Sequence, residues 1–391
     1  MNDRTSLLRP RTNHEAARVG SIELFFDLVF VFAVTQLSHA LLGHLTLAGA
    51  AQVGLLLVAV WWVWIYTSWV TNWLDPERIP VRVCLFVLMI VGVLLASSIP
   101  SAYGSRGVTF AASYALMQVG RTLFFLWALR GASLDLRRNF RRVLLWFVLS
   151  AVFWIVGAQA QGDARFAWWL LAMGIDLVAP SLLFWVPGLG RSATTEWNIE
   201  GGHLAERCSL FVIIALGESL LVTGATFAGL EWDRSTQIGM LVAVSGSILM
   251  WWIYFDTGAE RALHRIRHST DPGREGRSAY TYVHVLIVAG IVVCAVADEL
   301  VLTHAHHATD AAIVAILGGP AGYLVGTASF KWITNDRKTP PLSHVAGLVL
   351  LGSLTWPAMN HLLTPLALGA ATTGVLAVVA VWEAIALRRA S

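Results

Sequence analysis

Long apolar stretches alternate with short polar segments along almost the whole chain. The apolar stretches run to about 18 to 24 residues, the length that a helix needs to cross the roughly 30 Å hydrocarbon core of a bilayer. Cutting the chain at charged or Gly/Pro-rich segments gives twelve candidate spans, near 21–43, 51–73, 81–99, 108–130, 142–160, 166–186, 205–229, 236–258, 279–303, 310–332, 343–362 and 366–387. The pattern predicts an all-α polytopic membrane protein.

The basic residues predict how these spans are oriented. With the N-terminus in the cytoplasm, the outer loops hold only Arg106, Arg165 and Arg234, and Arg121 lies within a span. All remaining Lys and Arg residues then fall on the cytoplasmic side, as the positive-inside rule requires. The first apolar run is also longer than a signal-peptide core, so it is expected to be retained. We therefore expect about twelve transmembrane helices with both termini cytoplasmic.

Weak internal similarity indicates two halves of six helices. SIELFFDLVFVFAV near position 21 resembles LAERCSLFVIIALG near 204, and WWVWIY at 61 resembles WWIYFD at 251. Because six spans return the chain to the same side, such halves would form a parallel repeat about an axis along the membrane normal. Chance similarity between apolar segments is the alternative. The expected organisation is a cytoplasmic segment at 1–20, a first half at 21–186, a cytoplasmic linker at 187–204, a second half at 205–387 and a cytoplasmic tail at 388–391.

Composition narrows the class of protein further. Of the 391 residues, 57% are hydrophobic and 13% are charged, and the mean hydropathy is +0.66, whereas a soluble domain has about 25% charged residues. A net charge of +3 gives no reason to expect a nucleic-acid partner. No phosphate-binding loop, dinucleotide-binding turn, nucleophile elbow or zinc-binding helix motif stands in a convincing context. We expect a lipid bilayer as partner, an unidentified small molecule or ion as substrate, and no cofactor.

Several segments resemble one known family. They are ELFFDLVFVFAVTQLS at 23–38, WWVWIYTSWVTNWLDPE at 61–77, ERCSLFVIIALGESLL at 206–221, WWIYFD at 251–256 and HVLIVAGIVVCAVADE at 284–299. In this order they resemble the bacterial low temperature requirement protein A (LtrA) family. The resemblance implies a multi-pass protein of the bacterial cytoplasmic (inner) membrane. It implies no substrate, so a mechanism has to come from the side chains.

Two carboxylates lie in the first predicted span. Glu23 and Asp27 are four residues apart, so they share one face of a helix. Two acids this close in a low dielectric resist double ionisation, which favours a shared proton or cation. The alternative is an acidic first turn stabilised by the helix dipole, which suits Glu23 better than Asp27.

Further charged residues lie deep within other spans. Arg121 is near the middle of the fourth span, so an ion pair with Asp27, Glu218 or Asp176 is expected. Glu218 falls at the midpoint of the seventh span beside a glycine, which favours a transporter-like midplane site. Asp176 has no charged neighbour in sequence, and Asp256 near the inner end of the eighth span has a basic cluster after it. We predict that these residues, with Glu23, Asp27 and Asp298, bind a substrate or protons.

The outer end of the ninth span brings acids close to histidines. Asp298 and Glu299 precede His304, His306 and His307. Such a group can coordinate a divalent metal or take up protons near neutral pH. The spacing matches no strong zinc motif, so a solvated loop is the simpler interpretation.

Two classes of function remain open on these residues. The first is a proton- or ion-coupled secondary transporter with a midplane site formed by Asp27, Glu218, Arg121 and Asp176. The second is an intramembrane enzyme that uses a buried Asp or Glu for acid-base chemistry on a lipophilic substrate. The transporter explains the number of spans and the buried charges together and is preferred.

Overall fold

The computed structural model of the chain describes residues 6–9, 19–131, 133–193, 196–197, 199–307, 309–334 and 339–388. Parts of the predicted N-terminal segment, linker and tail lie outside the described residues. So do several basic residues on which the predicted orientation depends, namely Arg4, Arg11, Arg18, Arg337, Lys338 and Arg389.

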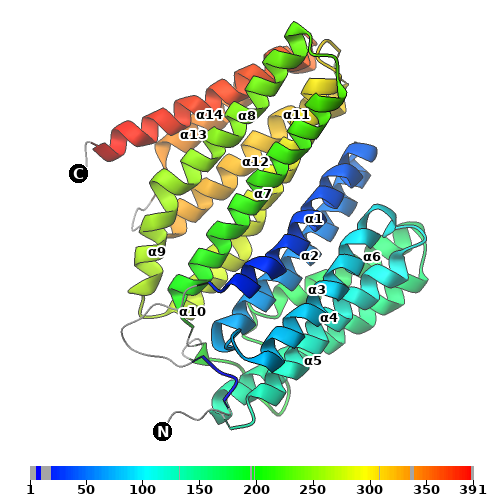
Figure 1. The fold of residues 1–391 in the computed structure, drawn as a ribbon, viewed down its shortest axis with the longest axis vertical. Helices are drawn as coiled ribbons and strands as arrows, with labels where there is room; N and C mark the ends of the chain where they lie inside the picture. Colours follow the sequence, from blue (N-terminus) through cyan, green and yellow to red (C-terminus); the bar gives the residue numbers. More distant parts are fainter. Residues whose placement is uncertain are drawn as a thin grey trace. The chain divides into compact units, whose positions relative to one another are not determined.

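The described residues form helices and no β-strand (Figure 1). The helices are α1 (Ser21–Gly43), α2 (Leu47–Trp73), α3 (Ile79–Ser98), the 3₁₀-helix η1 (Ile99–Ser101), α4 (Gly107–Ala128), α5 (Leu134–Gln159), α6 (Gly162–Val178), α7 (Gly201–Gly229), α8 (Arg234–Tyr254), the π-helix η3 (Phe255–Ala259), α9 (Glu260–Arg267), α10 (Pro272–Glu275), the π-helix η4 (Gly276–Val283), α11 (His284–Thr303), α12 (Asp310–Thr334), α13 (Leu342–Met359) and α14 (Pro365–Arg388).

Ten helices in the described part of the chain are long and apolar enough to cross a membrane. They are α1, α2, α3 with η1, α5, α7, α8, the continuous stretch Pro272–Thr303, α12, α13 and α14. Each of the twelve predicted stretches overlaps a helix, but α4 and α6 are not among the ten. α6 has 17 residues, fewer than the roughly 20 that cross a bilayer, and α4 carries Gln118 and Arg121 near its middle. The count of twelve spans therefore stays a prediction.

The sixth predicted stretch, 166–186, extends beyond the helix that forms there. α6 ends at Val178, two residues before Pro180, because the proline nitrogen has no N–H to continue the helical hydrogen bonds. The chain then turns, and Leu183 and Phe184 both adopt left-handed φ angles of 53° and 49°. Hydropathy alone did not reveal this break, since the turn itself is apolar.

The chain divides into two compact units, and each is described by itself. Unit 1 takes in the described residues up to Leu37, then Ala51–Arg207 and Ser269–Arg277. Unit 2 takes in Ser38–Ala50, Cys208–His268 and the described residues from Ser278 onward. In unit 1, α3 packs on α4, α4 on α5 and α5 on α6; in unit 2, α11 packs on α12, and α8 packs on α14 (Figure 1).

α2 supplies much of the interior of unit 1. Its tryptophans Trp61, Trp62, Trp64, Trp69 and Trp73 are all buried. Their rings contact one another and aromatic side chains of neighbouring helices, with centroids about 5 to 6 Å apart. The tryptophan row is therefore a packed core.

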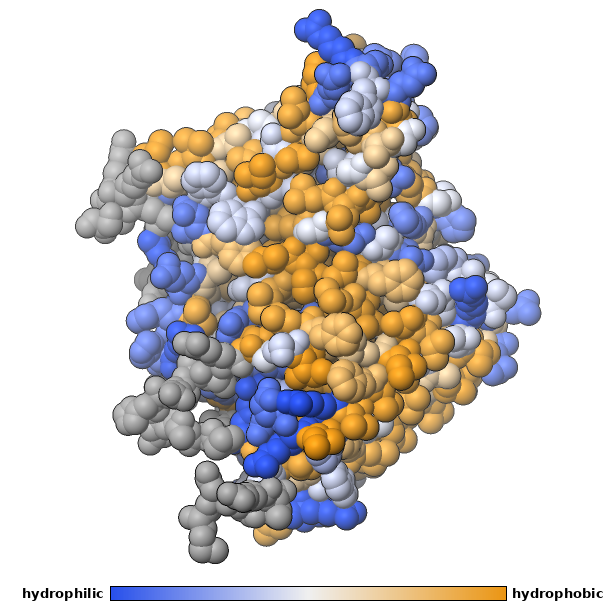
Figure 2. Space-filling view, in the orientation of Figure 1, coloured by the Kyte–Doolittle hydropathy of each residue, from blue (hydrophilic) through white to orange (hydrophobic). Residues whose placement is uncertain are grey.

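Apolar side chains also cover much of the face seen in Figure 2. α3 illustrates the pattern, because Val83, Phe86, Val87 and Ile90 are exposed on one side while Leu85 and other apolar residues are buried on the opposite side. A helix that is apolar on both faces is typical of a membrane span that faces lipid.

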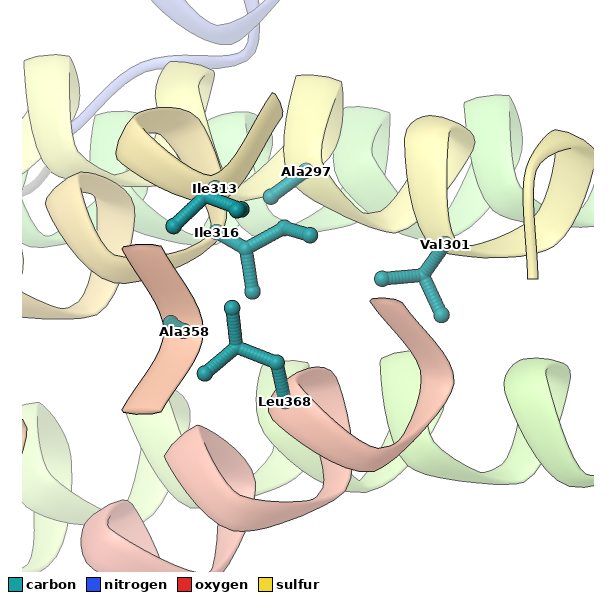
Figure 3. Close-up of a cluster of buried hydrophobic side chains, with 6 residues drawn as sticks. All are labelled: Ala297, Val301, Ile313, Ile316, Ala358 and Leu368. Carbon is teal, nitrogen blue, oxygen red and sulfur yellow. The ribbon is translucent and has the colours of Figure 1, made fainter. Parts of the chain in front are cut away.

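In unit 2, α11 and α12 approach each other closely at glycines. A Cβ built on Gly290 would lie 2.4 Å from the backbone nitrogen of Tyr323, and one built on Gly319 would lie 2.8 Å from that of Cys294. Small residues allow such backbone contact between membrane helices. Beside this pair, an apolar cluster joins α11, α12, α13 and α14 (Figure 3). Its buried members are Ala297, Val301, Ile313, Ile316, Ala358 and Leu368.

Candidate functional site

The two acids predicted on the first helix meet two bases on α7. Glu23 and Asp27 are four residues apart on α1, and His203 and Arg207 are four residues apart on α7, so each pair lies on one helix face. All four side chains are completely buried within unit 1. We call Glu23, Asp27, His203 and Arg207 the α1–α7 cluster.

Arg207 bridges both carboxylates. Its Nη1 lies 3.0 Å from Glu23 Oε1, and its Nη2 lies 2.6 Å from Asp27 Oδ1. Its guanidinium also lies over the Trp64 ring, 5.6 Å from the centroid. A buried charge is tolerated only when it is paired and hydrogen-bonded, so Arg207 and the two acids depend on one another.

Within the described part of the chain, only one of the two carboxylate oxygens of Asp27 has hydrogen-bond partners. Trp64 Nε1 donates a hydrogen bond of 2.7 Å to the same Oδ1 that Arg207 contacts. The other oxygen, Oδ2, is buried and has no hydrogen-bond partner among the described residues. Asp27 therefore keeps an open position for a proton, a water molecule or a cation.

Glu23 is surrounded by donors. Its Oε2 accepts hydrogen bonds from the Gly20 backbone N–H at 2.9 Å and from Arg9 Nη2 at 2.8 Å, and its Oε1 lies 3.0 Å from His203 Nε2. Arg9 in turn donates to the backbone oxygens of Thr71 and Leu74, each at 3.0 Å. Glu23 thus completes the first turn of α1 and also belongs to the cluster; its role in binding a proton or a cation stays a prediction.

Asn72 on α2 helps to position the His203 ring. Its amide pairs with both backbone groups of Glu200: Nδ2 donates to the carbonyl at 2.8 Å, and Oδ1 accepts from the N–H at 2.8 Å. The same Nδ2 lies 3.4 Å from His203 Nδ1. His203 Nε2 lies 3.0 Å from Glu23 Oε1 and 3.2 Å from Arg9 Nη2, so the ring contacts both an acid and a guanidinium. The two guanidiniums of Arg9 and Arg207 face the two carboxylates.

A second buried network in unit 1 links Arg121 with Asp176. Arg121 donates to Gln118 Oε1, Gln118 Nε2 donates to the Tyr114 hydroxyl at 3.2 Å, and Tyr114 donates to Asp176 Oδ2 at 2.6 Å. Ser150 donates to the same oxygen at 2.7 Å. Every hydrogen bond points from the cation to the anion, so the bonds polarise one another. We call Arg121, Gln118, Tyr114 and Asp176 the Arg121–Asp176 relay.

The expected direct ion pair of Arg121 is not formed among the described residues. Its Nη1 instead donates to the Val63 carbonyl and the Thr67 hydroxyl, each at 3.1 Å. The guanidinium lies 5.8 Å from the ring centroids of both Tyr66 and Phe147. Neutral acceptors and aromatic faces therefore surround the buried Arg121 guanidinium. A chain of side-chain hydrogen bonds connects this cation to Asp176.

The remaining predicted residues belong to neither of these two networks. Glu218 is buried on α7, and Asp256 is exposed in η3, where it accepts a hydrogen bond of 3.0 Å from Trp252 Nε1. Asp298 lines a small cavity in unit 2. Glu218, Asp256 and Asp298 all belong to unit 2, whereas Glu23, Asp27, Arg121 and Asp176 belong to unit 1.

The predicted metal ligands after α11 lie at the surface. His304, His306 and His307 are exposed, and Glu299 is partly buried. His304 Nδ1 lies 2.8 Å from the Thr303 hydroxyl, which also donates to the Glu299 carbonyl at 2.7 Å. Within the described residues, no three His, Cys, Asp or Glu side chains lie close enough together to hold a metal ion.

Sequence reasoning missed the basic side of the α1–α7 cluster. Neither His203 nor Arg207 is among the predicted site residues, and the basic-residue pattern predicts only that Arg207 lies on the cytoplasmic side. The signal was present, because His203 and Arg207 repeat the four-residue spacing of Glu23 and Asp27.

A buried charged group in unit 2 was missed as well. Lys331 donates to the Ile253 carbonyl at 2.9 Å and pairs with Glu383, while His344 Nδ1 lies 3.3 Å from Glu383 Oε1. The basic-residue pattern predicts only that Lys331 lies on the cytoplasmic side of the membrane. Glu383 lies in the last predicted span.

These features define a multi-pass, all-helical membrane protein that buries paired charges between its helices. The model of the bacterial low temperature requirement A protein (LtrA) family matches residues 18–381, and the chain belongs to that family. A similar protein is the uncharacterized protein RA0937 of Rhizobium meliloti (strain 1021), which is 39% identical over 381 residues that cover 97% of this chain and 92% of the relative. The comparison with solved structures found no match.

Proposed function

We propose that the protein is a proton-coupled secondary transporter and that Asp27 takes up and releases the coupling proton. The observation that carries this proposal is the one-sided environment of Asp27. One carboxylate oxygen is bonded to Arg207 and Trp64, whereas the other is buried without a partner. A buried acid whose second oxygen has no partner is a suitable proton acceptor, because burial favours its neutral form.

Protonation of Asp27 would change the charge of the whole cluster. The guanidiniums of Arg9 and Arg207 balance the carboxylates of Glu23 and Asp27, all held within hydrogen-bonding distance. A proton on Asp27 leaves one uncompensated positive charge on the Arg207 side. Since an isolated charge is costly in a membrane interior, the protonated cluster favours binding of one anionic group at Arg207. The proposed cycle therefore moves a proton together with a small anion.

The Arg121–Asp176 relay supplies a second set of buried charges in the same unit. Both networks contact α2, because Trp64 touches the α1–α7 cluster and Thr67 touches Arg121. We propose that Arg121 and Asp176 belong to the transport pathway and that Glu218, Asp256 and Asp298 contribute further polar positions. The two six-helix halves, the cytoplasmic termini and a location in the bacterial inner membrane remain part of this proposal.

The experiment uses the full chain in liposomes that contain a pH-sensitive dye. A panel of small anions, beginning with chloride, phosphate, acetate and amino-acid anions, is added outside, and proton entry is recorded. At least one anion is expected to drive proton entry, and Asp27→Asn should lower that rate about tenfold or more. Asparagine keeps an acceptor for Trp64 but cannot carry the proton.

Asp163→Asn is the matched control, because Asp163 is an exposed acid in the first turn of α6. It should leave the rate unchanged. Proton coupling that persists in a folded Asp27→Asn protein would rule out the proposed role, and the absence of anion-driven proton movement across the panel would count against the transporter.

A further inference from the structure

Unit 2 contains a small cavity for which the proposed transport cycle names no ligand. It lies between α8, α11, α12 and α14 and has a volume of about 30 Å³. That is room for about one water molecule or one small ion. Its polar lining comes from Asp298, Thr372 and Thr373.

Asp298 reaches this cavity without a protein partner. Among the described residues, no side chain or backbone group forms a hydrogen bond or an ion pair with its carboxylate. The neighbouring wall is apolar, because Ala297, Val301 and Ile316 line the cavity and also belong to the apolar cluster of Figure 3. A carboxylate beside such a wall is costly unless something neutralises it.

Two further groups that line the cavity, a backbone carbonyl and a hydroxyl, offer oxygen atoms. Pro320 lies inside α12 and has no N–H to give to the carbonyl of Ile316, four residues earlier. Thr372 donates its hydroxyl proton to the Gly369 carbonyl at 3.0 Å, so the lone pairs of its oxygen stay available. Broken helices and freed carbonyls of this kind coordinate ions in membrane transporters.

From this arrangement we propose that the cavity binds one sodium ion, with Asp298 as the charged ligand. Cys294 and Met250 also line the cavity, but the charged ligand is a carboxylate and the threonines add oxygens, so the site favours a hard cation. A single carboxylate balances one monovalent charge, whereas calcium sites gather several acidic oxygens. The small volume favours sodium over a larger monovalent cation. The proposal does not depend on the role of Asp27, because the two residues lie in separate units.

Direct binding of radioactive sodium to the purified full chain in detergent tests this proposal, with choline replacing sodium at constant ionic strength. The wild-type protein should bind one sodium ion saturably and unfold at a higher temperature as sodium is added. Asp298→Asn should weaken the affinity about tenfold or more. Glu299→Gln is the matched control, because Glu299 is the next residue of α11 and does not line the cavity; its affinity should match that of the wild type.

Gly246→Ala tests the cavity without changing its charge. A Cβ on Gly246 would meet Thr373 Oγ1 at 3.5 Å, an ordinary contact, so the protein should fold while the cavity shrinks. Sodium affinity should fall in this variant too, which keeps the test decisive if Asp298→Asn does not fold. The proposal is overturned if the wild type binds no sodium saturably, as it would if Asp298 simply holds a proton. Wild-type affinity in a folded Asp298→Asn protein, or in Gly246→Ala, would overturn it as well.

Discussion

Arg207 Nη2 lies 2.6 Å from Asp27 Oδ1, and both side chains are fully buried. Arg207 also contacts Glu23, so one guanidinium bridges two acids of the same helix face. This shared cation links the start of α7 to the first turns of α1 and makes the cluster sensitive to the charge of any one member.

Arg207→Met should destabilise the protein severely, because two buried carboxylates lose their shared cation. Breaking a buried ion pair by removing one partner costs about 3 to 5 kcal/mol. The free energy of unfolding in mixed micelles measures the loss. Arg82→Met is the control, since Arg82 pairs with Glu77 at the exposed surface and such pairs contribute about 1 kcal/mol or less. Equal losses in the two variants would contradict a structural role for the Arg207 bridge.

Tyr114→Phe should interrupt the Arg121–Asp176 relay. The variant removes a buried donor to Asp176 and an acceptor from Gln118, and we expect a loss of about 1 to 3 kcal/mol in unfolding free energy. Tyr103→Phe provides a comparison, because the Tyr103 hydroxyl makes one long hydrogen bond of 3.3 Å to the Gln52 carbonyl. If Tyr114→Phe costs no more than Tyr103→Phe, the relay does not hold its charges in place.

Gly319→Ala and Gly318→Ala should differ sharply although they are adjacent in α12. A Cβ at position 319 would lie 2.8 Å from the Cys294 backbone nitrogen, whereas a Cβ at 318 would meet nothing within 4 Å. Overpacking of this kind costs about 1 to 3 kcal/mol, so Gly319→Ala should lower the unfolding temperature. Gly318→Ala should leave it unchanged or raise it slightly. The reverse order would show that α11 and α12 do not pack as described.

Arg165→Lys should be costly even though the charge is kept. Arg165 donates to four carbonyls, those of Ala102 at 2.8 Å, Gly104 at 2.7 Å, Ala160 at 3.0 Å and Ala158 at 3.2 Å. A lysine ammonium cannot reproduce this planar set of donors. We expect a loss of about 2 kcal/mol in unfolding free energy.

Arg106→Lys gives the matched measurement for Arg165, because the exposed Arg106 contacts only the Ser97 carbonyl through its side chain in the described structure. Its unfolding free energy should change by about 0.5 kcal/mol or less. A similar small change in Arg165→Lys would mean that a point charge is enough at that position.

Hydropathy predicted where the helices lie but not where every helix begins or ends. α5 starts at Leu134 rather than near 142, because Ser133 accepts a hydrogen bond from the Leu136 N–H and caps a polar first turn. A search for apolar residues omits such a turn. The predicted end of α6 was wrong for the opposite reason. The turn that follows α6 is apolar, so hydropathy extended the predicted helix through it.

The acids of the candidate site were predictable because a charge within an apolar span is conspicuous in one sequence. Their partners were not, because the contact between α1 and α7 depends on tertiary packing across 180 residues of sequence. The same limit explains Arg121, for which a direct ion pair was expected. Arg121 donates instead to Gln118 and Thr67, and neutral polar residues of this kind in a membrane helix do not identify themselves as partners of a cation.

The π-helix η3 has a consequence for how this family can vary. It begins two residues after Ile253, whose carbonyl accepts a hydrogen bond from Lys331. A π-turn holds about one residue more than an α-turn, so deleting one residue here would restore α-helical geometry and keep the buried face of α9 in place. We expect alignments of relatives to tolerate a single-residue gap at this stretch.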